Sequence, residues 1–215
     1  MKILVACEES QAVCKEFRAL GHEAYSCDLQ DCSGGHPEWH LKEDVFKVLE
    51  SELWDMVIAF PPCTHLSLSG AKHFAKKRES GVQRDGIEFF AKMLNIDCPK
   101  LAIENPMNIM GGGKYLIEHF PDLCELYDIP SKYTQTIQPY EYGDSAQKTT
   151  RLWLKGLPEL IPTTPEGEQD KGEFVTTPSG KKLPKWYSDD KKGKNRSKTF
   201  QGIAKAMADQ WGGVV

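Results

Sequence analysis

Short apolar runs alternate with amphipathic segments through the first part of the chain. Residues 2–6 and 54–60 are nearly continuous apolar runs, a pattern typical of strands that are buried on both faces. Residues 22–29 predict another strand between them. Residues 10–20 instead place their apolar side chains at helical spacing, and Gly21 suits the C-cap of that helix.

The same alternation continues further along the chain. A short helix is predicted around residues 45–49, and a longer one over residues 82–94, where one face is apolar. Residues 100–103 and 152–154 predict two more strands, and residues 114–127 predict a helical or mixed segment. Because strands and helices alternate, we expect a doubly wound, mostly parallel α/β sheet with helices on both faces.

Composition divides the 215 residues into three segments. Residues 1–161 carry the alternating pattern and predict the core. Residues 162–198 hold four prolines and many charges but few aliphatic residues, which is typical of a long loop or a small insertion. Residues 199–215 return to helical spacing and predict a C-terminal helix that packs back on the core.

Polar and reactive residues follow four of the predicted strands. The ligands of parallel sheets bind beyond the carboxyl ends of the strands, so clusters at these ends are expected to meet at one edge. The clusters are Cys7-Glu8-Glu9-Ser10, Asp28, Pro61-Pro62-Cys63 and Glu104-Asn105-Pro106. The sequence therefore predicts a candidate site at this edge of the sheet.

Cys63 comes directly after two prolines at the end of a predicted strand. Proline fixes its own φ and restricts the residue before it, so the turn is stiff and could hold the thiol toward a cleft. The alternative is a small buried side chain, the usual role of a free cysteine.

Glu104 ends a predicted buried strand. A carboxyl group there is costly unless it is paired or holds a proton. A protonated carboxyl group would suit a proton donor near neutral pH, and the alternative is a carboxylate that caps a helix or forms a salt bridge.

In this order, Pro-Pro-Cys and Glu-Asn-Pro resemble the paired signatures of the DNA cytosine-C5 methyltransferase family, in particular small phage-type homologues. In that family Pro-Cys carries the nucleophile and Glu-Asn-Val carries the acid. Residues 147–151, Gln-Lys-Thr-Thr-Arg, resemble the family's Gln-x-Arg-x-Arg, with Thr149 in place of the first arginine. The resemblance implies a Rossmann-like methyltransferase fold without a full target-recognition domain, unless residues 162–198 are its vestige.

The resemblance also implies S-adenosylmethionine as the cofactor. The loop after the first strand stands where the family has Phe-x-Gly-x-Gly-Gly, but these glycines are absent. Asp28 matches the acidic residue at the cofactor ribose, and Asp44 lies near the position of the adenine-contacting aspartate. The residues implied to bind the cofactor are Cys7, Glu8, Glu9, Asp28, Asp44, Phe60 and Pro61.

The chemistry of the implied reaction suits these residues. The Cys63 thiolate would add to C6 of cytosine, so that C5 becomes able to attack a sulfonium methyl group. Glu104 would protonate N3, and Arg151 would hold the carbonyl oxygen of the base. The target cytosine must leave the duplex to reach such a site. RNA cytosine is an alternative substrate for the same chemistry.

Two other functions remain open from the sequence. Amino-methyltransferases carry a Pro-Pro loop between a polar residue and an aromatic residue, but here Phe60 and Cys63 take the outer positions. The altered first loop also allows a degenerate homologue that binds nucleic acid without catalysis.

A DNA contact must come from a local patch, because the chain has a net charge of −4. Residues 181–198 combine many cations with two aromatic residues, which suits phosphate contact and base stacking, and the alternative is a solvated loop. The candidate nucleic-acid contacts are Ser67, Ser69, Lys185, Lys191, Lys192, Lys194 and Arg196.

Cysteine usage bears on the compartment. The chain has seven cysteines, an odd number, and no Cys-x-x-Cys pair, so we expect reduced thiols and a cytoplasmic protein. Cys27, Cys32, His36 and His40 have only loosely zinc-like spacing, and we expect no metal site there. No apolar stretch approaches the roughly 18 residues of a membrane span, so we expect no membrane partner.

Overall fold

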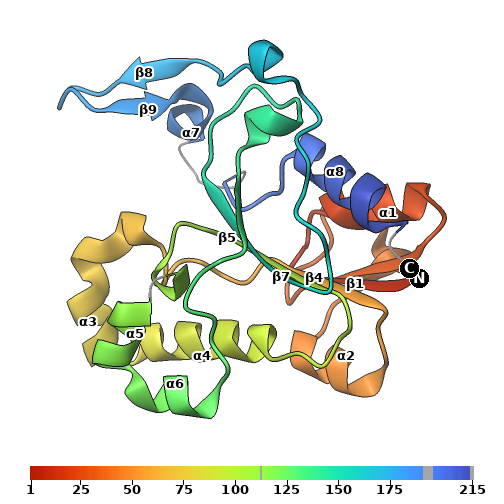
Figure 1. Ribbon diagram of the computed structural model, residues 1–215, viewed down its shortest axis with the longest axis horizontal. Coiled ribbons are helices and arrows are strands. Elements are labelled where there is room, and N and C mark those ends of the chain that lie inside the picture. The colour runs from red at the N-terminus through yellow and green to blue at the C-terminus, as the bar shows by residue number, and fades with distance from the viewer. Residues whose placement is uncertain (112, 191–195, 214–215) are drawn as a thin grey trace.

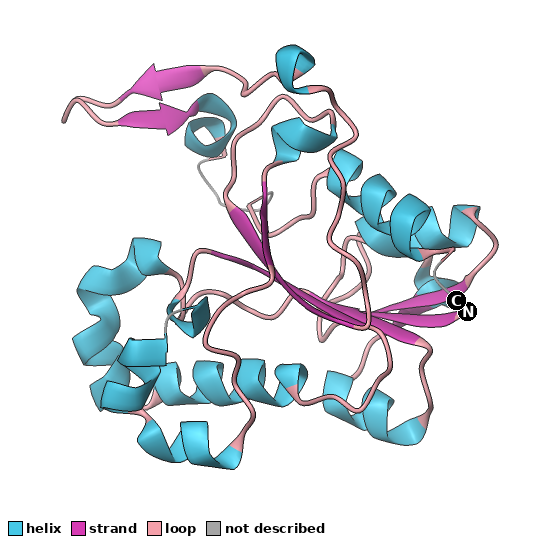
Figure 2. Ribbon diagram, in the orientation of Figure 1, coloured by secondary structure: helices cyan, strands magenta, loops and turns pink. Residues whose placement is uncertain are grey.

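A computed structural model of the chain describes residues 1–111, 113–190 and 196–213. Its centre is a seven-stranded sheet with the order β3-β2-β1-β4-β5-β7-β6 (Figures 1 and 2). The strands are β1 (Lys2–Ala6), β2 (Glu23–Cys27), β3 (His40–Leu41), β4 (Met56–Ala59), β5 (Leu101–Pro106), β6 (Gln135–Ile137) and β7 (Thr150–Lys155). The strand order reverses between β1 and β4, and such switch points are where open parallel sheets bind ligands.

Helices cover both faces of the sheet. Figure 1 shows α1 (Ala12–Ala19) and α8 (Gln201–Trp211) together on one face. The other face carries α2 (Val45–Ser51), α4 (Val82–Leu94), α5 (Gly113–His119) and α6 (Pro121–Leu126). The expected doubly wound, mostly parallel Rossmann-like sheet is therefore confirmed.

The sheet is parallel from β3 to β5 and antiparallel at its other edge. β7 runs antiparallel to both β5 and β6, and its pairing with β5 sets Glu104 opposite Leu152 and Asn105 opposite Arg151. The central strands read as continuous apolar runs because both of their faces are buried, as the sequence predicts.

The core forms two layers, one on each side of the sheet. One layer joins Val5 and Ile58 of the central strands to Phe17 of α1 and Trp211 of α8. The other layer packs strand side chains such as Val57 and Ile103 against α2, α4, α5 and α6. The sheet is thereby held between the two helix layers, and its carboxyl-end loops are free to form a site.

The strands and helices that the hydrophobic pattern predicts are present, with small shifts of their ends. The helix expected over residues 82–94 is found with these bounds as α4, and β5 extends beyond residues 100–103. The short strands β3 and β6 and the helical segment 68–79 were not predicted. The segment 68–79 comprises η2 (Leu68–His73) and α3 (Phe74–Glu79), and only Phe74 of it is buried. One buried apolar residue gives no period to recognise.

The segment 162–198 has more regular structure than a loop. Its described part contains the 3-10 helix η5 (Glu166–Glu168), the hairpin β8 (Phe174–Thr176) and β9 (Lys182–Pro184), and α7 (Lys185–Asp189). The hairpin projects from the body of the protein (Figure 1). Trp186 links it to the core, since its indole Nε1 donates to the Gln147 carbonyl at 3.3 Å. Three further 3-10 helices are η1 (Pro37–Trp39), η3 (Ile109–Gly111) and η4 (Pro139–Tyr142).

In the parts of the chain that the structure describes, none of the helices has the length and apolar character required to cross a bilayer.

We predict that Trp211→Ala lowers the free energy of unfolding by about 3–5 kcal/mol, because a large buried aromatic side chain leaves a cavity. Trp211 is fully buried, and its Nε1 donates to the Pro158 carbonyl at 3.0 Å, so α8 loses its main anchor. Urea unfolding measures the loss. Leu53→Ala is the control, because Leu53 is 92% exposed and its change should stay within about 0.5 kcal/mol.

Candidate active site

The loops after β4 and β5 are joined by buried hydrogen bonds. Asn105 Nδ2 donates to the Pro61 carbonyl at 2.7 Å, and Asn108 Nδ2 donates to Asn105 Oδ1, also at 2.7 Å. Asn105 is 1% exposed. A buried polar group left without a partner is costly, so these bonds fix the two loops relative to each other.

Cys63 begins a tight turn that is held against the loop after β5. Its carbonyl accepts from the backbone N–H groups of Leu66 and Ser67, at 3.0 and 2.9 Å. Ser67 then forms a β-bridge with Asn108, and Leu68 N donates to the Met107 carbonyl at 3.0 Å. The cysteine is thus positioned by its own turn and by the loop that follows Glu104.

The structure brings Cys63 and Glu104 close enough to interact electrostatically. Burial is the main cause that raises the pKa of the Cys63 thiol, and the negative charge of Glu104 is the second. The positive charges of Lys148 and Lys77 act in the opposite direction. Lys148 also approaches the carboxylate itself, with its Nζ 4.0 Å from Glu104 Oε1. A thiol, a carboxyl group and an ammonium group therefore share one half-buried site.

Arg151 lies beside Tyr133 and the loop that follows Glu104. Its guanidinium carbon lies 4.2 Å from the centre of the Tyr133 ring, and NH1 makes a long contact of 3.5 Å with the Asn108 carbonyl. It is not among the groups that shift the pKa of Cys63. A cation that does act on Cys63 is Lys148, which the motif of residues 147–151 contains at a position with no assigned role.

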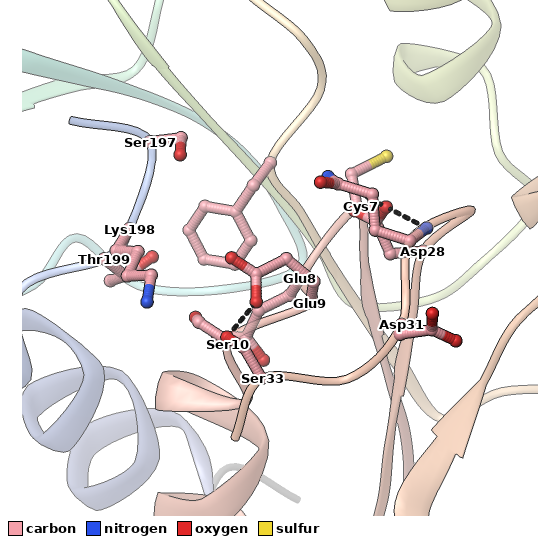
Figure 3. A pocket seen from close by; sticks show the side chains of 12 residues that line it. Cys7, Glu8, Glu9, Ser10, Asp28, Asp31, Ser33, Ser197, Lys198 and Thr199 are labelled. Carbon is pink, nitrogen blue, oxygen red and sulfur yellow. Dashed lines mark hydrogen bonds between the residues drawn. The ribbon is translucent and has the colours of Figure 1, made fainter. Parts of the chain in front are cut away.

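A pocket of about 470 Å³ opens beyond β1, β2 and β4, at the switch point of the sheet (Figure 3). In Figure 3, Ser197, Lys198 and Thr199 lie across the pocket from Cys7 and Asp28. Its lining residues are Cys7, Glu8, Glu9, Ser10, Asp28, Gln30, Asp31, Ser33, Phe60, Ser197, Lys198 and Thr199. Of the seven residues expected to bind a cofactor, five line this pocket. Ser197, Lys198 and Thr199 were not among the residues expected to bind the cofactor.

The loop after β1 keeps a glycine-like backbone without glycine. Cys7 and Gln11 both have positive φ, at 59° and 58°. The buried Gln11 side chain donates from Nε2 to the His36 carbonyl at 2.8 Å, and its Oε1 accepts from His36 N at 3.1 Å. Gly34 lies against it, where a Cβ would come within 2.5 Å of Gln11 Cβ. These contacts hold a loop that otherwise would be strained.

Glu8 lines the pocket, and its side chain caps the N-terminus of α1. Its two carboxylate oxygens accept from Val13 N at 2.7 Å and from Cys14 N at 3.2 Å. Burial raises the pKa of Glu8 to about 8, although these two hydrogen bonds act in the opposite direction. Glu8 therefore caps the helix end where anions bind in many α/β proteins.

Asp28, Asp44 and Pro61, all expected at the cofactor, take distinct positions. Asp28 lines the pocket, and its Oδ1 accepts from Gln30 N at 2.9 Å. Asp44 is the N-cap of α2, where its Oδ1 accepts from Phe46 N at 2.8 Å, and it is outside the pocket lining. Pro61 is also outside the lining, and its carbonyl accepts the hydrogen bond from Asn105.

The cations expected to contact nucleic acid are partly engaged within the protein. Lys185 pairs with Glu173 at 2.7 Å, and the guanidinium group of Arg196 stacks on Tyr187 at 3.8 Å. Arg196 also donates to the Asp190 carbonyl at 2.8 Å. Lys191, Lys192 and Lys194 lie outside the described residues. Ser67 and Ser69 form a 2.9 Å hydrogen bond with each other in the turn after Cys63.

The segment 68–79 carries a cationic surface that the sequence analysis did not single out. It holds Lys72, His73, Lys76, Lys77 and Arg78 against a single acid, Glu79. Lys77 Nζ donates to the carbonyl of Thr64, the residue after Cys63, at 2.6 Å. The cationic surface therefore adjoins the turn of Cys63. The run of basic residues was visible in the sequence, but its nearness to Cys63 depends on the turn.

The side chains with zinc-like spacing have other partners. Cys27 Sγ donates to the Glu43 carbonyl at 3.4 Å, and Cys32 Sγ donates to Gln11 Oε1 at 2.9 Å. His36 stacks on Trp39, and His40 Nδ1 lies 2.9 Å from Ser26 Oγ. All seven cysteines, each within the described ranges, are free thiols.

Comparisons with known proteins give one structural neighbour to report. No protein-family model matches the chain, and no curated protein does. One solved structure with a related chain path is a protein from E. coli, assigned as a DNA modification methyltransferase encoded within a prophage. The sequences are 12% identical and the TM-score is 0.44. The match covers 71% of this chain but 45% of that one, so this chain spans less than half of its length.

We predict that Glu8 makes stability depend on pH. Its pKa is about 8 in the folded protein and 4.5 as the ordinary value, so between these the folded state binds more protons than the unfolded state. The contribution of Glu8 to the free energy of unfolding is therefore complete below pH 4.5. It is lost as pH rises toward 8, by about 1.4 kcal/mol per pH unit.

Urea unfolding across this pH range tests the prediction. The free energy of unfolding of Glu8→Gln minus that of the wild type should increase with pH. Glu9→Gln is the control for removing one acidic side chain from the same pocket wall. A difference for Glu8→Gln that does not vary with pH would contradict a protonated Glu8.

Proposed function

We propose that the protein methylates C5 of cytosine in DNA, with S-adenosylmethionine as methyl donor and Cys63 as nucleophile. The observation that carries the proposal is the meeting of Cys63 and Glu104 at the ends of two neighbouring parallel strands. The bond between Asn105 and Pro61 fixes these ends, and a pocket opens beyond the adjoining strands.

The pocket fits the proposed methyl donor in size and charge. Its volume of about 470 Å³ lies within the range of small-molecule sites, roughly 300–1,000 Å³. Asp28 offers carboxylate oxygens to the ribose hydroxyl groups, and Phe60 offers an aromatic surface. Lys198 is the cation of the lining, and it suits the carboxylate of the donor. When bound, S-adenosylmethionine would supply the electrophilic methyl group.

The roles of this chain's own residues follow from their chemistry. The thiolate of Cys63 forms a bond to C6 of the base, and the electron pair of the 5,6 double bond moves toward C5. Glu104 donates a proton to N3 and so neutralises the charge that builds in the ring. After C5 has gained the methyl group, it loses its own proton to water acting as a base, and Cys63 leaves C6 as a thiolate. N3 then returns its proton to the Glu104 carboxylate.

A target base reaches this site only outside the helix stack. Cys63 lies on a turn at the protein surface rather than in the closed core, and the cationic segment 68–79 begins a few residues after it. The site therefore suits an extruded cytosine, whose flanking phosphates would meet Lys72 and Lys76.

Two observations bear on the alternative functions. An amino-methyltransferase has no use for a thiol at the Pro-Pro loop, but this turn positions Cys63 beside Glu104. A degenerate homologue is favoured by the loop after β1, where Glu8 fills the end of α1. Calorimetric titration with S-adenosylmethionine decides this second case, since a degenerate homologue would bind none at millimolar concentration.

We predict that Cys63→Ser abolishes methyl transfer, because a serine hydroxyl group forms an alkoxide far less readily than a thiol forms a thiolate. Glu104→Gln should reduce the rate by about two to four orders of magnitude, the usual value of general acid catalysis. Transfer of tritium from S-adenosylmethionine to DNA measures both. Cys124→Ser is the control, because Cys124 is a half-buried thiol on α6, away from the site.

A duplex containing 5-fluorocytosine tests the covalent step directly. Wild-type protein and Cys124→Ser should form a stable protein–DNA adduct, and Cys63→Ser should form none. Near-normal methylation by Cys63→Ser would make the C5 mechanism wrong and would favour an amino-methyltransferase. Because serine and cysteine are similar in size, DNA and cofactor binding should persist in the variant.

We also predict that the double change Lys72→Ala and Lys76→Ala weakens DNA binding and lowers its salt dependence. Each phosphate contact releases about 0.9 of a counterion, so the slope of log affinity against log salt should fall by about two. Fluorescence anisotropy measures the slope. Lys155→Ala with Lys205→Ala removes two exposed lysines elsewhere and is the matched control. Equal slopes for both double variants would place the DNA contact on another surface.

A further inference from the structure

Lys148 is the one cation within ion-pair distance of Glu104 among the described residues. The distance from Lys148 Nζ to Glu104 Oε1 is 4.0 Å, and the two side chains are only 18% and 13% exposed. An ion pair this far from solvent is poorly screened by salt, unlike the exposed pairs on the surface. The pair therefore sets the charge of the space beside Cys63.

We propose that Lys148 is a positioning residue of the active site, which holds the Glu104 carboxyl group toward Cys63 and favours the thiolate form of the cysteine. The proposal rests on the proposed function, since it assigns Lys148 a part in the same reaction. It adds a residue for which the resemblance of the sequence gives no role.

The charge balance around Cys63 supports this assignment. Thiolate formation beside a carboxylate places two negative charges in one partly buried space, which is unfavourable without a cation. Glu104 raises the pKa of Cys63, and Lys148 lowers it. The remaining charged group that acts on Cys63 is Lys77 from α3. The titratable residue nearest to Cys63 in the sequence is His65, two positions after Cys63.

Lys77 and Arg151, the other cations near the site, are less suited than Lys148 to hold Glu104. Lys77 Nζ is held by the Thr64 carbonyl, and Lys77 forms no ion pair with Glu104 within the described structure. Arg151 is stacked on Tyr133 and contacts the Asn108 carbonyl. Of the cations in the described ranges, Lys148 alone lies within ion-pair distance of Glu104 while also acting on Cys63.

The test follows the alkylation of Cys63 by iodoacetamide as a function of pH. Mass spectrometry of the peptide that contains Cys63 separates it from the other six cysteines. We expect Lys148→Met to move the profile to higher pH by about one unit, the lower end of the effect of a close opposite charge. Lys148→Arg keeps the cation and should restore the wild-type profile. Lys155→Met, on the far end of β7, should leave it unchanged.

Coupling to Glu104 separates positioning from a general effect of charge. Glu104→Gln should move the profile to lower pH, since it removes the nearby anion. In that background Lys148→Met should move it by a smaller amount than in the wild type, because the ion pair is already lost. Equal shifts in both backgrounds, or no shift for Lys148→Met, would overturn the proposal. The buried Cys98 reports unfolding, and Lys148→Gln replaces any variant in which Cys98 becomes reactive.

Methyl transfer by the same variants distinguishes this proposal from the proposed function. Lys148→Met should shift the pH profile of methylation in the same direction as that of alkylation, and Lys148→Arg should rescue it. Methylation that depends on Cys63 but not on Lys148 would overturn the role of Lys148 alone. If the wild type methylates no cytosine while its alkylation profile still responds to Lys148, the C5 function falls and the control of Cys63 by Lys148 remains.

Discussion

The buried hydrogen bond from Asn105 Nδ2 to the Pro61 carbonyl is the constraint on which the rest of the site depends. Proline residues provide no N–H groups, so the loop of Pro61 and Pro62 cannot be held to β5 by an ordinary backbone ladder. The Asn105 side chain instead holds the loop through the Pro61 carbonyl, the acceptor that proline retains. Because Cys63 follows this loop and Glu104 precedes Asn105, a single buried bond sets how the thiol and the carboxyl group face each other. The same asparagine accepts from Asn108, and the constraint thereby extends to the turn after Cys63.

The loop after β1 shows how a tight turn persists without glycine. Positive φ at a non-glycine residue costs on the order of 1–3 kcal/mol, and here it occurs at both Cys7 and Gln11. The four contacts of the Gln11 amide, to Ser26, to Cys32 and twice to His36, offset this strain. The glycine needed for close approach is instead Gly34, which lies against Gln11 from the loop after β2. This wall of the pocket is therefore built from two loops that contact each other closely.

The sequence predicted the fold well where burial imposes a period. Central strands such as β1 and β4 and the amphipathic helix α4 were predicted because both kinds of element have strong apolar patterns. The short edge strand β3 and the segment 68–79 were missed, because partners elsewhere in the chain hold them in place. The meeting of Cys63 and Glu104 was predicted from the strand ends. The position of Lys148 beside Glu104 was not, since it depends on how the chain enters β7.

Charge divides the proposed active site into two parts with different tasks. The pocket wall carries Glu9, Asp28 and Asp31 against Lys198, and an acidic wall favours a cationic ligand such as a sulfonium. In the proposed reaction the methyl donor loses that positive charge when its methyl group leaves, so the same wall would hold the neutral product less tightly. At Cys63 the requirement is reversed, because an anion must form there. A cation is therefore needed beside Cys63, and Lys148 provides it next to the acid that would otherwise oppose the thiolate.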